Sequence, residues 1–419
     1  MADIVAALSR VRREPFAHHL PIAATVDQLC RDQGHSWRDR LFTPLVTLRL
    51  FVLQVLHGNT SITHLRQLCG IDFAASSYSD ARSRLPLQVF GGLLESMARW
   101  AGQAATTFAF IGQRVFICDA SSFSMSDTEE LREHFGLPPS CKPGIGYPVA
   151  KLMGLMDAAT GLFTQLLAAP LFTHDMRHVL RLHPILRAGD ILLGDRAYCT
   201  YTHLALLQLQ GVFGCFRLHQ RRPTAIGFKR WKREGKAPAW MSVEQFQLLP
   251  REMEIRILQY TLEQRGFRTR NVIVATTLLD ERAWPDEKIA ELYGQRWQIE
   301  TCFDHLKTTM KMNVLKCQSL DGVMKELAVY AMVYNLVRLA MLRAAEQQRV
   351  SVSRISFVDA LRWLCGRMLG LPGIQRLLIN PYRPGRREPR VIRRRMKEFN
   401  LMKRPRAELK TMGNWGENR

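Results

Sequence analysis

The chain has 419 residues, 47% of them hydrophobic and 23% charged, which is the composition of a globular protein with two or three domains. Lys and Arg number 59 against 37 Asp and Glu, a net charge of +22 that indicates a polyanionic partner, most simply nucleic acid; solubility alone is the alternative. The nine cysteines include no CxxC pair, which argues against a zinc site and a disulfide framework. The chain shows no signal-peptide core, and its most apolar run, 41–56, is too short for a membrane span, so we expect a cytoplasmic protein without a membrane segment.

Residues 1–105 have helical patterning and are predicted to form an N-terminal helical, DNA-binding domain. Within them, SITHLRQL, the glycine-containing turn CGIDFAAS and SYSDARSRLP are typical of a helix-turn-helix whose second helix reads DNA. That helix would expose Ser77, Tyr78, Arg82 and Arg84. A plain helical hairpin with a polar face has the same pattern, and both interpretations stay open.

From Arg114 the pattern changes to strands. RVFICD predicts a strand ending in Asp119, and residues 151–170 predict two strands joined by an Ala-Thr-Gly turn. DILLGD predicts a buried strand ending in Asp195. Helical stretches follow the hairpin and Asp195, so residues 106–217 indicate a mixed α/β sheet with helices on its faces.

Residues 218–270 interrupt this pattern with a strongly basic stretch. It holds 12 Lys and Arg against five Asp and Glu, with Trp231 and Trp240 among them. We predict a β-rich insertion that faces a charged partner, and the alternative is a solvated hairpin.

The α/β pattern resumes over residues 271–345. A long helix is expected after Pro285, a second over about 322–347, and a third over about 357–369. Residues 346–419 would comprise this last helix and a tail from Pro381 with 13 basic residues against four acidic ones. The tail is expected to bind a polyanion; a solvated tail without a specific role is the alternative.

The helix after Pro285 carries a polar stripe beside an apolar face. With the 100° turn per residue of an α-helix, Ile299, Phe303, Leu306 and Met310 fall within roughly 40° of Leu292. The stripe borders this face at roughly 40–100°, where burial strengthens its charges; it consists of Tyr293, Arg296, Glu300 and Lys307. A surface Arg296–Glu300 pair is the simplest alternative, but it explains only two of these four residues.

Asp119 and Asp195 each follow an apolar strand run and could point into a cleft at the rim of the sheet. Each alone is more typical of a turn or a helix cap, but together with Glu300 they offer the oxygen ligands that magnesium prefers. Asp157 in the hairpin turn and Asp190 at the start of its strand are the rival acids, and we expect both to point elsewhere.

His174 and His178 have a metal-like i,i+4 spacing. Without an HExxH motif around them, we expect surface or capping histidines rather than metal ligands.

The stripe also carries a family resemblance. Tyr293, two residues, Arg296, three residues, Glu300, six residues and Lys307 reproduce the Y-(2)-R-(3)-E-(6)-K signature of DDE transposases in the insertion sequence four group. DASSFSMSD resembles the first-Asp segment of that family, GDRAY the second, and AVYAMVYNLVRLA the helix that follows. The resemblance covers residues 114–343.

This resemblance implies a ribonuclease H-like core and a DNA transposase that cuts element ends and transfers them into target DNA. It implies double-stranded DNA as the partner, a homodimer in the DNA complex, a location at the bacterial nucleoid, and two Mg²⁺ ions, with Mn²⁺ as a substitute. The implied catalytic metal ligands are Asp119, Asp195 and Glu300, and the implied phosphate-binding residues are Tyr293, Arg296 and Lys307.

One departure from the family concerns tryptophan. Some relatives stack a flipped base on a Trp shortly before the signature helix, but the comparable strand here, RNVIVATTLL, has none. Trp231, Trp240 and Trp284 are the nearest candidates, so a hairpin intermediate is not expected. The alternative functions are a catalytically inactive DNA-binding derivative of a transposase and another ribonuclease H-like nuclease.

Overall fold

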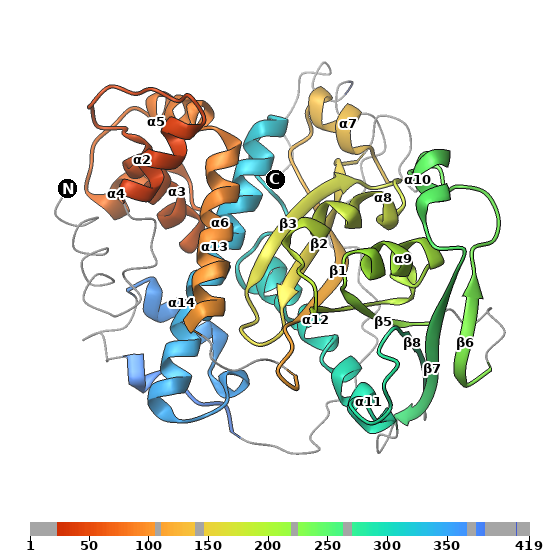
Figure 1. The fold of residues 1–419 in the computed structure, drawn as a ribbon. Coiled ribbons are helices and arrows are strands. Elements are labelled where there is room, and N and C mark those ends of the chain that lie inside the picture. Colours follow the sequence, from red (N-terminus) through yellow and green to blue (C-terminus); the bar gives the residue numbers. More distant parts are fainter. Residues whose placement is uncertain are drawn as a thin grey trace.

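The computed structural model describes residues 23–104, 110–138, 146–218, 225–262, 270–366, 374–381 and 408. Its centre is an eight-stranded sheet with the order β3-β2-β1-β4-β5-β8-β7-β6 (Figure 1). The strands are β1 Val115–Ser124, β2 Val149–Asp157, β3 Phe163–Pro170, β4 Ile191–Gly194, β5 Phe213–Arg217, β6 Gly227–Lys232, β7 Glu252–Leu262 and β8 Arg270–Thr276.

The first five strands form the mixed sheet that the sequence predicted. β1, β2 and β3 are an antiparallel meander, and β4 and β5 continue parallel to β1. The parallel strands need crossovers, which α8 (Asp175–Val179) and α9 (Tyr201–Leu209) provide. This arrangement is consistent with the ribonuclease H-like core that the resemblance implied.

β1 is longer than predicted. The sequence placed its end at Asp119, but the strand continues to Ser124 and pairs with β2 from Phe116↔Asp157 to Ser124↔Val149. The run of small polar residues after Asp119 has weak strand propensity, and the ladder with β2 outweighs it. Asp119 therefore lies within the strand, not at its end.

The sheet is covered on both faces (Figure 1). Phe116 and Cys118 of β1 point to one face, where they pack in one apolar cluster with residues of α8 and α9. Ile117 and Phe123 point to the other face and join a larger cluster with α6 (Leu87–Ala104), α12 (Trp297–Asp304) and α13 (Leu320–Gln348). Because successive side chains alternate along a strand, Asp119 points to this second face.

The long helix α13 is the centre of the larger cluster. Among the described residues it is the one helix long and apolar enough to cross a membrane, yet 78% of its most apolar window is buried inside the protein. It is therefore a core helix of this fold, as predicted for about 322–347.

The N-terminal part is helical, as predicted (Figure 1, left). Its helices are α2 Ala23–Asp32, α3 Pro44–Leu56, α4 Ile62–Cys69, α5 Ala75–Arg84 and α6. Val26, Phe51 and Phe90 belong to the same apolar cluster as α13, so these helices share a core with the sheet. The domain boundary at 105 stays a prediction that this packing does not mark.

Two side chains expected on the outside of α5 turn inward. Tyr78 is fully buried, and its hydroxyl donates to Gln54 Oε1 at 3.1 Å. The Arg82 guanidinium lies 3.7 Å from the centre of the Phe51 ring. Ser77 and Arg84 are exposed, as predicted. The expectation was wrong for Tyr78 and Arg82 because their side of α5 packs against α3.

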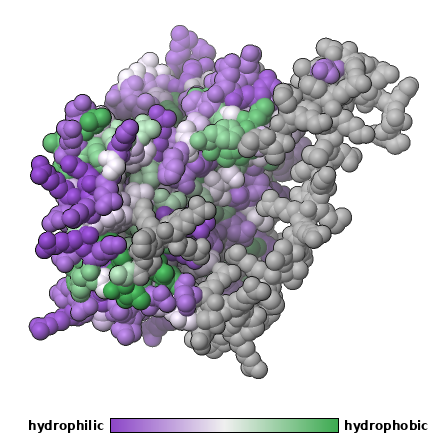
Figure 2. Space-filling view, turned by 90° about the vertical axis from the view of Figure 1, so that its right-hand side faces the viewer, coloured by the Kyte–Doolittle hydropathy of each residue, from purple (hydrophilic) through white to green (hydrophobic). Residues whose placement is uncertain are grey.

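The strands of the basic stretch 218–270, predicted as an insertion, extend the central sheet. β8 pairs with β5, β7 with β8 and β6 with β7, and α10 (Val243–Leu248) connects β6 to β7. Figure 2 shows this side as largely hydrophilic with small, separate hydrophobic patches. The buried Arg256 of β7 donates to the Trp284 carbonyl at 2.6 Å and pairs with Asp286, which ties the insertion to the helix that follows.

The single long helix predicted after Pro285 is divided into three segments. They are α11 (Asp286–Gly294), α12 and a π-helical turn (His305–Thr309), with a break at residues 295–296. Further along, the predicted third helix is α14 (Phe357–Leu364). Of the basic tail after Pro381, the described residues include Glu408 alone, so the prediction for the tail lies outside the described residues. The remaining segments are α7 Glu129–Phe135 and the 3₁₀ turns Leu180–Ile185, Arg196–Tyr198, Val352–Arg354 and Ile374–Arg376.

Candidate active site

Asp119 is the first acid of the site. It points from β1 toward α12, and 18% of its side chain is exposed. One carboxylate oxygen accepts a hydrogen bond from the Ala120 N–H at 2.8 Å, and the other lies 3.3 Å from Arg296 Nη1. The acid is thus held by its own strand and by the signature helix.

Asp195 follows β4 directly, on the strand beside β1. The parallel ladder between these strands ends at Ile117↔Leu193, and Asp119 and Asp195 each lie two residues further along. Asp195 begins the turn Arg196–Tyr198, but its side chain makes no capping hydrogen bond. Of the turn and cap roles weighed for this residue, the structure therefore has the turn but no side-chain cap.

Arg296 links Glu300 of α12 to Asp119 of β1. Its guanidinium contacts Glu300 Oε1 at 2.9 Å through Nη2 and Asp119 through Nη1, while the side chain is only 8% exposed. The surface-pair alternative predicted the first contact, but the second one crosses from α12 to β1. Burial removes the water that would solvate this charge, so the two carboxylates are its compensating partners.

The surroundings of Asp119 oppose its ionisation. The pKa of Asp119 is raised to about 6, mainly by burial and also by the negative charges of Asp195 and Glu300, against the hydrogen bond from Ala120 and the charge of Arg296. Asp195 and Glu300 thus each make a smaller contribution than burial to the raised pKa of Asp119. A carboxyl group that is perturbed by burial and by two other carboxylates is typical of a functional site.

Tyr293 and Lys307 complete the polar stripe, and the structure gives each a partner. Tyr293 is buried, and its hydroxyl lies 3.3 Å from the Gly194 carbonyl, the residue before Asp195. Lys307 Nζ donates to Ser121 Oγ at 3.0 Å, and Ser121 lies two residues beyond Asp119 on β1. Both side chains thus contact the strands that carry the aspartates.

The predicted apolar face of this helix is confirmed. Leu292, Ile299, Phe303, Leu306 and Met310 are all buried, with Leu292, Ile299 and Leu306 at 0% exposure. Their packing fixes which side of α11 and α12 faces the sheet, and so places the polar stripe against β1 and β4.

The chemistry of the donors fits a hard divalent ion, because all three acids supply carboxylate oxygens. The side chains are not arranged around a shared ion position, because Asp119 and Glu300 are paired with Arg296. Across the described residues, no group of three or more His, Cys, Asp or Glu side chains is placed so that it could hold a metal ion. The ligand set Asp119, Asp195 and Glu300 therefore stays a prediction.

The two rival acids are used elsewhere. Asp157 accepts hydrogen bonds from the backbone and hydroxyl of Thr160 in the hairpin turn. Asp190 forms a two-pronged pair with Arg114, at 2.8 and 2.5 Å, on the far end of β4 from Asp195.

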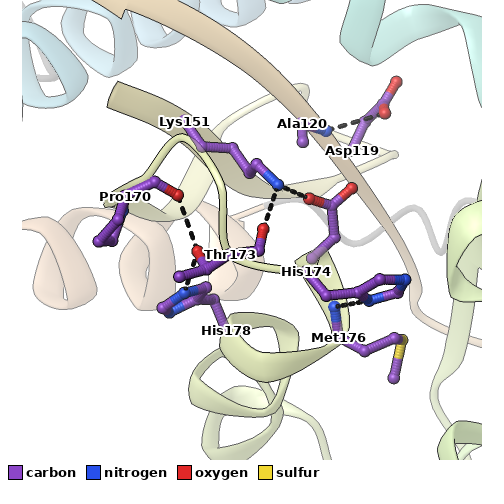
Figure 3. Close-up of polar contacts among 9 residues, drawn as sticks. Asp119, Ala120, Lys151, Pro170, Thr173, His174, Met176 and His178 are labelled. Carbon is purple, nitrogen blue, oxygen red and sulfur yellow. Dashed lines mark hydrogen bonds and ion pairs between the residues drawn. The ribbon is translucent and has the colours of Figure 1, made fainter. Parts of the chain in front are cut away.

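A polar cluster around α8 accounts for both histidines (Figure 3). Lys151 donates to the Thr173 carbonyl at 2.5 Å and pairs with Asp175. His174 Nδ1 accepts the Met176 N–H at 3.2 Å and caps α8, and His178 Nε2 lies 2.7 Å from the Thr173 hydroxyl. His174 thus has the capping role that was one of the two expected for these histidines.

The tryptophans named as candidates for base stacking are packed against other side chains. Trp284 is buried and stacks on Phe110 with ring centres 5.7 Å apart. Trp231 packs edge-on against Tyr201. Trp297, which the sequence patterns did not single out, is 44% exposed and its ring lies 4.7 Å from the Arg296 guanidinium. Its position directly after Arg296 in the stripe was the available signal.

Ser121 was also missed. Two residues beyond Asp119 on an extended strand, it necessarily shares the face of Asp119. The predicted strand ended too early, so this relation could not be seen.

Comparison with known proteins identifies the family of the chain. The family described as "Transposase DDE domain" matches residues 111–336, more than half of the chain. The chain is 24% identical over 315 residues to the transposase InsG for insertion sequence element IS4 of Escherichia coli (strain K12), covering 72% of this chain and 69% of that protein. The chain therefore belongs to the DDE transposase family, as the Y-R-E-K spacing and the two aspartate segments predicted.

Proposed function

We propose that this transposase cleaves DNA strands at the ends of its element and joins the freed 3′ ends to target DNA, by cut-and-paste chemistry at Asp119, Asp195 and Glu300. The observation that supports this most is the buried Arg296, which contacts carboxylates from β1 and α12. The electrostatic influence of Asp195 on Asp119 adds the third acid.

DDE transposases use divalent metal ions. In this proposal Asp119, Asp195 and Glu300 would hold two Mg²⁺ ions, with Mn²⁺ as a substitute. When bound, such ions activate an attacking water or 3′-hydroxyl and stabilise the leaving oxygen.

The remaining residues of the stripe bind and position. Arg296 and Lys307 are the cations beside the acids, and a guanidinium suits two-pronged phosphate contacts. The family resemblance implied a phosphate contact for Tyr293 as well. Because its hydroxyl is buried against the Gly194 carbonyl, we propose that Tyr293 is a positioning residue for the turn of Asp195. Water is the attacking group in the cleavage step, which leaves a 3′-hydroxyl and a 5′-phosphate. In the joining step this 3′-hydroxyl replaces one phosphodiester of the target with another, so neither step requires a covalent protein intermediate.

DNA is the proposed partner, as element ends and as target, and a homodimer is the proposed form of the complex. The net charge of +22 supports a polyanionic substrate. The basic insertion lies at the edge of the same sheet that carries Asp119 and Asp195, so DNA bound at the site could run along it.

The test is to incubate the purified protein with DNA from both flanks of its own gene, with and without Mg²⁺, and to map the cut ends. We expect Mg²⁺-dependent cuts at two fixed positions and, with added target DNA, joined products. Binding without cutting in the presence of Mg²⁺ would support the inactive derivative instead. Cutting that follows branched structure rather than the flank sequence would support another ribonuclease H-like nuclease.

A further inference from the structure

A hollow of about 730 Å³ lies in the N-terminal helices, away from the acids of the active site. One wall is the segment 35–42, between α2 and α3, and the other is the outer side of α5. From α5 come Ser77, Asp80 and Arg84, which share one side of a helix at i, i+3 and i+7. The floor is apolar and buried, and includes Pro44, Phe73 and Leu85.

Three arginines give this hollow its charge. Arg38, Arg40 and Arg84 line it together with one acid, Asp80, so the lining carries +2 (three minus one) with His35 neutral. All three are exposed, and none forms an ion pair or side-chain hydrogen bond with another residue in the described part of the chain. We call the hollow lined by these three arginines the arginine hollow. Its charge is available to an anion.

An aromatic surface lies beside these arginines. The rings of Trp37 and His35 stack with centres 5.9 Å apart, and both line the hollow. The pKa of His35 is lowered, first by burial and then by the charges of Arg84 and Lys325. Aromatic rings between basic side chains are the means by which many proteins hold a nucleic-acid strand.

The geometry of α5 argues against reading of the major groove. A recognition helix needs an open outer side with base-contacting side chains. Here that side forms a wall of the hollow and carries the acid Asp80, while Tyr78 and Arg82 are turned inward. Arginines without base-reading partners instead suit phosphate contacts, which position DNA without reading its sequence.

We infer that the arginine hollow binds the phosphate backbone of a DNA strand, through Arg38, Arg40 and Arg84, with Trp37 against a sugar or base. It would hold DNA during the reaction without selecting its sequence. The inference rests on the proposed function in taking DNA as the substrate.

The test compares Arg→Gln variants in fluorescence-anisotropy titrations of labelled duplexes at salt concentrations of about 50–200 mM. Arg84→Gln and the triple variant Arg38→Gln/Arg40→Gln/Arg84→Gln are set against Arg66→Gln. Arg66 lies on α4 of the same helical part and outside the hollow, where it pairs with Asp72. Removal of one phosphate-binding cation should reduce the slope of log K against log salt by about 0.9.

We expect a slope lower by about 0.9 for Arg84→Gln, and by up to about 2.7 for the triple variant, equally for duplexes of different sequence. The triple variant should bind at least about tenfold more weakly at about 100 mM salt. Arg66→Gln should keep the wild-type slope, and all variants should keep the wild-type unfolding midpoint, because the three arginines have no described partners to lose.

A wild-type slope in the triple variant would overturn the inference. A loss of affinity for only one duplex sequence would also overturn it, because that result indicates base reading. Competition by dAMP at the same phosphate concentration as the DNA would overturn it as well, because that result indicates a small-molecule site. These results are separate from cleavage: a protein that cuts no flanking DNA but shows the expected slopes would refute the proposed function and leave this inference standing.

Discussion

Asp119 combines burial, two neighbouring negative charges and one neighbouring positive charge. Its pKa is about 6 in the folded chain against an ordinary value of 3.8, so the fold favours its protonated form. That stabilising contribution is complete below about pH 3.8 and is lost as pH rises through about 6. At neutral pH without metal, the ionised Asp119 therefore costs stability.

Asp119→Asn should remove that cost. We expect it to raise the free energy of unfolding by about 1–3 kcal/mol at about pH 7.5 in EDTA, and to change it little at about pH 4, where Asp119 is protonated. Urea unfolding at both pH values measures the difference. An equal effect at the two pH values would mean that ionisation of Asp119 is not the cause.

Tyr293→Phe tests the positioning of the Asp195 turn. The substitution removes the hydrogen bond to the Gly194 carbonyl and should cost about 1 kcal/mol of stability. If Tyr293 acts through Asp195, the single-turnover cleavage rate should fall about tenfold or more while the affinity for DNA is kept.

Tyr201→Phe is the matched control, because the Tyr201 hydroxyl bonds to the Pro250 carbonyl away from the acids. It should lose similar stability and keep the cleavage rate. A Tyr293→Phe protein that binds DNA more weakly but cuts at the normal rate would return Tyr293 to the phosphate role.

Among the larger elements, a buried polar network links the N-terminal helices to α13. Glu326 is 1% exposed and accepts hydrogen bonds from Asn59 Nδ2 at 2.5 Å and from the backbone N–H groups of Lys316 and Cys317 at 3.0 and 2.8 Å. Leu315, directly before Lys316, pairs with the end of β1, because its N–H donates to the Ser124 carbonyl.

Glu326→Ala would leave those donors buried without an acceptor. We expect a loss of about 2–4 kcal/mol in unfolding free energy. Glu346→Ala on the same helix removes an exposed acid paired with Arg343 and should cost less than about 1 kcal/mol. Equal losses would show that the buried network does not join the two parts.

The sequence was most informative where its patterns are local. The apolar face of the signature helix, the hairpin at 151–170 and the strand before Asp195 follow from periodicity and turn residues. It was least informative where contacts between distant residues determine the structure. Pairing with β2 extends β1 beyond Asp119, and packing against α3 buries Tyr78. The contact of Arg296 with Asp119 crosses between elements far apart in the chain, so spacing could suggest a shared site but not that contact.

For the molecule as a whole, the excess of positive charge should appear in the salt dependence of DNA binding. The segment from Pro381 holds 13 basic and four acidic residues. Truncation before Pro381 should flatten the slope of log K against log salt by about 0.9 for each phosphate that the tail neutralises. A full-length variant with Gln at Arg393, Arg394 and Arg395 separates charge from chain length; an unchanged slope in both would mean that the tail does not touch DNA.

The proposed function depends above all on Asp119, Asp195 and Glu300 forming one metal-dependent site, separate from the surfaces that bind DNA. Single-turnover cleavage of end-labelled element DNA in Mg²⁺, measured beside binding on the same samples, tests this directly. Ala in place of any of the three should lower the cleavage rate at least about a thousandfold and leave affinity within about twofold. Glu291→Ala, on the exposed side of α11, should cut as the wild type does. Retained Mg²⁺-dependent cutting in any of the three variants would contradict the three-carboxylate site.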